Sequence, residues 1–143
     1  MARMRHRDDE LEQYHELCAY TLAHPSPSFI HQHVVDAFAA QHADATTKPI
    51  TVTFALIGLY LHVERKQTGR QVQRVHMLLA RRRKRWRTFD LPADRGDVTV
   101  CDVIGVPPGP ARDQMIDSWC ASVWEAYAAS HRMVVELMQS ELG

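Results

Sequence analysis

The sequence lacks a cysteine pair, a long apolar run and an excess of charge of either sign. Its three cysteines (Cys18, Cys101 and Cys120) form no C-x-x-C pair, which argues against a metal site of that type and indicates reduced thiols in a cytoplasmic protein. The longest apolar run, residues 54–61, is far shorter than the roughly 20 residues of a membrane-spanning helix, so we expect no membrane contact. The 17 Lys and Arg balance the 17 Asp and Glu, which argues against nucleic acid as a partner.

The common catalytic motifs are absent as well. The sequence contains no H-E-x-x-H, no G-x-S-x-G and no glycine-rich phosphate loop. No reaction can therefore be named from motifs. The unusual feature is the presence of nine histidines among 143 residues.

Helical spacing of apolar residues predicts an all-α fold. The pattern predicts a first helix over residues 9–23, and a second with Ser26 as N-cap and Pro27 at its first position. Residues 50–65 are apolar almost all round, which favours a central helix, although the first four could form a strand. A fourth helix is predicted from Gly69 to about Arg85.

The C-terminal third is predicted to hold an irregular loop and one long helix. Residues 86–98 show no periodicity, whereas Thr99 and Asp102 have capping-box spacing that predicts a short helix over 99–104, with a short strand as the alternative. The last helix is predicted to run over 111–141. We therefore expect a disordered leader (1–8) and a single domain (9–143), an up-and-down bundle of about five helices with one irregular loop before the long last helix.

Four histidines are predicted to lie at one level of this bundle. Residues equidistant from a short turn lie at the same height in antiparallel helices. Pro25 lies almost midway between His15 and His33, the connector at residues 47–48 lies midway between His33 and His62, and Gly69 is seven residues from both His62 and His76.

Convergent imidazoles predict a metal site. The leading hypothesis is one divalent transition metal, zinc first and iron, nickel or copper next, bound by His15, His33, His62 and His76, with His31 and His131 in reserve. An open coordination position would allow chemistry on a small-molecule substrate, with Glu16 or Glu64 as proton acceptor. The alternative for each histidine is a buried ring that hydrogen-bonds to a carbonyl or a carboxylate.

The basic run at residues 81–87 supports a different class of function. Six cations surround Trp86 at the end of the fourth predicted helix, where cations favour the negative end of the helix dipole. The alternative hypothesis is a non-enzymatic interaction or regulatory module that uses this run and the last helix, and the last helix could also form a homodimer.

Several segments resemble a known family. Tyr14-His15-Glu16, His31, residues 35–42, Gly58 to Glu64 and Gly69 to Gln73 resemble a bacterial family of small helical proteins known only as a domain of unknown function. The similarity covers about residues 14–125, and residues 35–42 are its most specific part. It implies a bacterial helical protein and no activity, and it adds interest to five polar residues: Glu16, His31, Asp36, His42 and Glu64. Many members begin with a zinc-knuckle cysteine pair, which this chain lacks.

Overall fold

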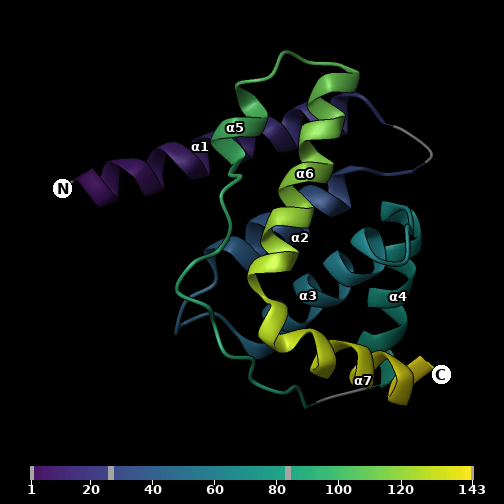
Figure 1. Cartoon of the computed structure of the whole chain (residues 1–143). Coiled ribbons are helices and arrows are strands. Elements are labelled where there is room, and N and C mark those ends of the chain that lie inside the picture. The colour runs from purple at the N-terminus through teal and green to yellow at the C-terminus, as the bar shows by residue number, and fades with distance from the viewer. Residues whose placement is uncertain (1, 26–27, 83–84, 143) are drawn as a thin grey trace.

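All regular secondary structure in the described part of the chain is helical. The computed structural model describes residues 2–25, 28–82 and 85–142. Seven α-helices and one 3-10 turn follow one another: α1 (Ala2–Ala23), α2 (His31–His42), α3 (Pro49–Val63), α4 (Gly69–Arg82), α5 (Val100–Ile104), α6 (Pro110–Ala126), η1 (Ala128–Ser130) and α7 (His131–Leu142). The all-α prediction is confirmed. The up-and-down bundle of about five helices is only a coarse description, because α1 projects from the molecule and α7 turns out of the line of α6 (Figure 1).

The first two helices begin at different residues from those predicted. α1 begins at Ala2, whereas the periodic pattern begins at residue 9; the division into a leader and one domain stays a prediction. The proposed capping residues Ser26 and Pro27 lie outside the described residues. α2 begins at His31 instead of Pro27, after Phe29 with φ of 57°, because a left-handed residue interrupts a helix.

α3 is the central helix, as its uniformly apolar sequence predicts, and no part of it is a strand. It contacts α2, α4, α6 and α7, so residues on every side of it meet other helices. Its fully buried residues include Leu56 and Ile57, and the core beside it holds Trp119 of α6. Among the described residues, no helix combines the length and apolar composition of a membrane span.

Gly58 allows α2 and α3 to approach closely. A Cβ at this position would overlap Oδ2 of Asp36 and lie 2.5 Å from its Cγ. The Asp36 side chain is buried, and its other oxygen accepts a hydrogen bond of 3.1 Å from Gln32 Nε2. Burial raises the pKa of Asp36 well above its ordinary value, although the Gln32 hydrogen bond acts in the opposite direction. A buried carboxyl group thus lies in the contact between two core helices.

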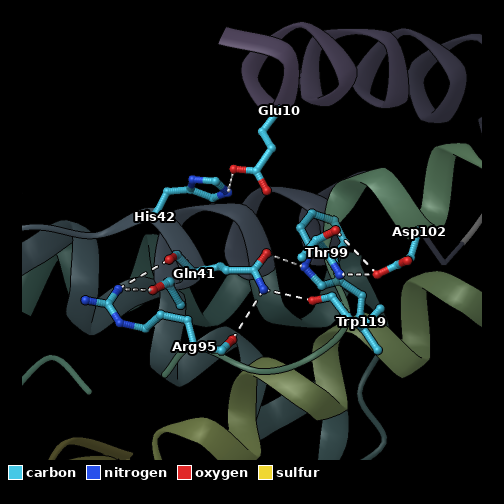
Figure 2. Close-up of polar contacts among 9 residues, drawn as sticks. Glu10, Gln41, His42, Arg95, Thr99, Asp102 and Trp119 are labelled. Carbon is cyan, nitrogen blue, oxygen red and sulfur yellow. Dashed lines mark hydrogen bonds and ion pairs between the residues drawn. The ribbon is translucent and has the colours of Figure 1, made fainter. Parts of the chain in front are cut away.

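The irregular segment 86–98 is held against the end of α2 by Arg95 and Gln41. Arg95 Nη1 donates to the carbonyls of Ala40, Gln41 and Ala43, and so caps the C-terminus of α2 (Figure 2). The buried Gln41 side chain donates to Val98 O at 2.8 Å and accepts from the Trp119 indole N–H at 2.9 Å. Figure 2 also shows the Glu10–His42 ion pair, 3.8 Å long, which joins α1 to the end of α2.

The capping box predicted from Thr99 and Asp102 is present, and it begins α5. α4 ends at Arg82 in the described residues, and Arg83 and Lys84 of the predicted basic run lie outside them. Local sequence signals of this kind therefore place the helix ends in this part of the chain well.

The long last helix predicted over 111–141 is wrong, because α6 ends at Ala126 and α7 begins at His131. The backbone leaves the helical conformation at Tyr127, with ψ of 23°. The Tyr127 hydroxyl donates to Ala40 O at 2.6 Å, and His131 Nε2 donates to Trp124 O at 2.8 Å. The His131 side chain thus pairs with a backbone carbonyl at the break. The sequence around the break contains neither proline nor glycine, the residues that usually indicate one.

Candidate functional site: a pocket beside two stacked histidines

A pocket lined by two of the predicted histidines lies between α2, α3 and α6, next to the loop from α3 to α4. Its volume is about 550 Å³. His33 of α2, His62 of α3 and Asp117 of α6 line it, together with three apolar residues and six other polar residues: Ile30, Val63, Ala121, Ser28, Lys66, Gln67, Thr68, Asp113 and Ser118. We call it the histidine-pair pocket.

His62 and Asp117 form an ion pair in this pocket. His62 Nε2 lies 2.9 Å from Asp117 Oδ1, and His62 Nδ1 lies 3.2 Å from the carbonyl of Gln67. The hydrogen bond from His62 holds the pKa of Asp117 below its ordinary value, so the carboxylate is ionised. Because both ring nitrogens face oxygen acceptors, the doubly protonated imidazolium satisfies this arrangement.

His33 stacks on the inner face of His62. The ring centroids are 3.4 Å apart and the planes differ by 17°. Burial, and then the charge of His62, lower the pKa of His33 to about 3, so its ring is neutral. His33 Nδ1 is buried without a hydrogen-bond partner. A neutral imidazole therefore lies against the ring that pairs with Asp117.

The predicted four-histidine layer does not form, because only His33 and His62 come together. His15 is exposed on α1. His76 is buried, donates through Nε2 to Phe54 O at 2.8 Å and stacks on the Phe54 ring. His76 thus meets α3 at Phe54, eight residues before His62 and about 12 Å from it along the helix axis.

The two reserve histidines also have separate places in the fold. His31 Nδ1 lies 2.9 Å from the Thr21 hydroxyl, and burial lowers the pKa of this ring. His131 stacks on Trp124 at 3.8 Å and bonds to the carbonyl of the same residue. In both cases the structure gives the ring a hydrogen bond within the fold.

The two predicted proton acceptors do not line the histidine-pair pocket. Glu16 is exposed on α1. Glu64 Oε2 accepts a hydrogen bond of 2.5 Å from the Trp124 indole N–H. In the described part of the chain, no group of three or more His, Cys, Asp or Glu side chains is arranged to hold a metal ion.

Asp117, the residue that pairs with His62, is not among the site residues predicted from the sequence. It is 55 positions away from His62 in the sequence, and its neighbours belong to a helix that is amphipathic throughout. To predict this pair, one would have to know how α6 is rotated about its axis relative to α3. No local motif reports such a rotation.

The family comparison covers all of these elements except the C-terminal part. Residues 11–128 match the family described as "Family of unknown function (DUF5946)". The chain belongs to this family. No curated protein matches the chain, and no solved structure does.

The DUF5946 match includes every residue that lines the histidine-pair pocket, as well as the close contact of Asp36 and Gly58. α7 and His131 follow its end. The pocket thus lies wholly within the part of the chain shared with the DUF5946 family.

Proposed function

We propose that this DUF5946 protein binds a small polar molecule in the histidine-pair pocket, and that His62 and Asp117 form the pair that contacts it. The observation that carries the proposal is their 2.9 Å ion pair on the wall of a pocket of about 550 Å³. Small-molecule sites combine apolar walls with a few well-placed polar groups. Ile30, Val63 and Ala121 supply the apolar part here.

The charges of the pocket are balanced. His62 and Lys66 are cationic groups, and Asp113 and Asp117 are carboxylates. A ligand with both hydrogen-bond donors and acceptors, such as a zwitterion or a polyol, fits this lining better than a highly charged ion.

The His62–Asp117 pair supplies acid–base chemistry. A ligand acceptor that replaces the Gln67 carbonyl at His62 Nδ1, now 3.2 Å away, would lie in position to receive the imidazolium proton. Asp117 would hold the ring orientation during this transfer, because its bond fixes the other nitrogen. His33 would exclude water from the inner face of the ring.

Histidine-detected NMR tests this function. Mixtures of amino acids, polyols, carboxylates and amines at millimolar concentration are added to the protein, and ring and backbone signals of the pocket are followed. Shifts confined to the pocket, and lost in His62→Gln and Asp117→Asn but kept in the exposed control His15→Gln, are the expected result. Pocket signals unmoved by all four classes would refute the proposal.

A metal ion is the second candidate ligand. Two imidazoles and one carboxylate are a donor set for iron or zinc, and the buried Nδ1 of His33 has no hydrogen-bond partner. The stacked rings run side by side, so binding would require His62 to turn out of the stack. Elemental analysis of untagged protein tests this. About one zinc or iron per chain, lost in His33→Ala and kept in His15→Ala, would support it, and metal-free protein that binds no added Zn²⁺ would refute it.

A further inference from the structure

The charges of this neutral chain are strongly segregated. Residues 8–47 contain seven acidic residues and no Lys or Arg: Asp8, Asp9, Glu10, Glu12, Glu16, Asp36 and Asp44. Residues 65–87 contain ten basic residues and no Asp or Glu: Arg65, Lys66, Arg70, Arg74, Arg81, Arg82, Arg83, Lys84, Arg85 and Arg87. α4 lies in the basic segment, and residues 9–23 of α1 lie in the acidic one, whereas the first turns of α1 contain Arg3, Arg5 and Arg7.

The exposed large hydrophobic side chains lie on the same two helices. Among the described residues, these are Leu11 and Leu22 of α1, with exposed fractions of 46% and 57%, and Met77 and Leu78 of α4, with 54% and 37%. A single exposed apolar residue is ordinary, but here all four lie on two of the helices. Residues 9–23 of α1 contain acidic residues and no Lys or Arg, and α4 contains arginines and no Asp or Glu. Each of these two stretches thus combines apolar side chains with charge of one sign, which is typical of a contact surface.

The exposed face of α1 is acidic along one side. Asp9, Glu12 and Glu16 are exposed and recur at helical spacing. Leu11 and Leu22, which are three turns apart, lie along the opposite edge of the same exposed arc. We call this surface the acidic face.

The exposed face of α4 has the opposite charge and a similar pattern. Arg70, Arg74 and Arg81 are exposed and lie in one row, about 16 Å long at 1.5 Å per residue. Met77 and Leu78 flank this row on its two sides. We call this surface the basic face.

The two faces belong to different parts of the molecule. Figure 1 shows the N-terminal half of α1 projecting on the left and α4 on the right. α1 packs against α2 and α5, whereas α4 packs against α2 and α3. The acidic face of one chain therefore needs a second chain to reach a basic face.

We propose that the protein forms a homodimer in which the acidic face of each copy docks on the basic face of the other. A two-fold axis repeats the contact, so both faces of both copies are covered and the assembly closes. Charge complementarity selects a second copy as the occupant, because the chain itself carries the matching acidic and apolar surface.

Sedimentation velocity with charge-reversed variants tests this. In the variant Glu12→Arg/Glu16→Arg the acidic face becomes basic, and in Arg74→Glu/Arg81→Glu the basic face becomes mixed in charge. Each variant alone is expected to dissociate with a Kd raised about tenfold or more. An equimolar mixture of the two is expected to form heterodimers, since both contacts then join opposite charges.

The controls separate this contact from general charge effects. Glu125→Arg/Glu136→Arg reverses two exposed acidic residues on α6 and α7 and should leave the dimer intact. Far-UV circular dichroism checks that every variant is folded. Raising the salt concentration should weaken the wild-type dimer, because exposed charges are screened.

Two results would overturn the proposal. One is a wild-type protein that remains monomeric at low salt and high concentration. The other is a mixture of the reversed variants that does not associate. A monomer that binds a fluorescent 20-nucleotide single strand through Arg74 and Arg81 would assign the basic face to nucleic acid instead.

Discussion

The close contact of Gly58 with Asp36 makes a strong prediction for stability. In Gly58→Ala, the new Cβ would lie 2.5 Å from Asp36 Cγ, about 0.9 Å closer than ordinary van der Waals contact at about 3.4 Å. Asp36 is 3% exposed, and its other carboxyl oxygen is held by the hydrogen bond from Gln32. Either α2 moves away from α3 or the carboxyl group leaves its hydrogen bond with Gln32.

The expected cost follows from three contributions. Overpacking in a core costs about 1–3 kcal/mol, and loss of the Gln32 hydrogen bond to a buried group costs about 1 kcal/mol more. Replacing a glycine inside a helix by alanine returns about 1 kcal/mol of helix propensity. The net expectation is a destabilisation of about 1–3 kcal/mol.

Urea unfolding, followed by circular dichroism, measures this cost in a double-mutant cycle. In an Asp36→Ala background the space for the Cβ exists, so Gly58→Ala should there become neutral or stabilising. The matched control is Gly105→Ala, because Gly105 has a helical φ of −66° and an added Cβ would meet neighbours only at 3.4 and 3.5 Å. A coupling energy below about 0.5 kcal/mol would contradict the close-contact argument.

Three further predictions concern buried polar groups. The pKa of His33 is about 3 in the folded protein and about 6.5 in the unfolded chain, so only the unfolded state binds this proton as the pH falls to about 5. The free energy of unfolding should therefore be about 2 kcal/mol lower at pH 5 than at pH 7. The same pH dependence in His33→Gln as in the wild type would refute this. The pKa of Asp36 is raised, so its contribution to stability falls as pH rises above about 4, and Asp36→Asn should unfold at higher urea than wild type at pH 7; a lower midpoint would count against it. Gln41→Ala leaves the Trp119 indole N–H buried and unpaired, which should lower the free energy of unfolding in urea by about 2–3 kcal/mol. If Gln41→Ala destabilises the wild-type protein no more than it destabilises the Trp119→Phe variant, the hydrogen bond contributes nothing.

The sequence predicts the local features of this fold well because their causes are local. The capping box at Thr99 and Asp102 needs only residues within one turn, and the structure contains it. The central position of α3 follows from its apolar residues on all sides. The break at Tyr127 could not be predicted in this way, since its hydroxyl bonds to Ala40, 87 positions earlier.

The histidine layer shows where the prediction from turn symmetry works and where it fails. Symmetry about a turn predicts height only where the two helices run closely antiparallel, and it leaves rotation about the helix axis open. α2 and α3 pack on each other, so His33 and His62 meet. His76 contacts α3 at Phe54, eight residues before His62, so the height predicted for it is wrong, and His15 is on the exposed side of α1.

The pocket and the close helix contact share α2 and α3, so the stability of one affects the geometry of the other. His33 and Asp36 are one turn apart on α2, and His62 follows Gly58 by one turn on α3. A change that pushes α2 from α3 at Gly58 must therefore also separate the stacked rings, which lie 3.4 Å apart. Because close packing transmits such shifts, Gly58→Ala should alter the histidine NMR signals of the pocket even though no atom of Gly58 lines it.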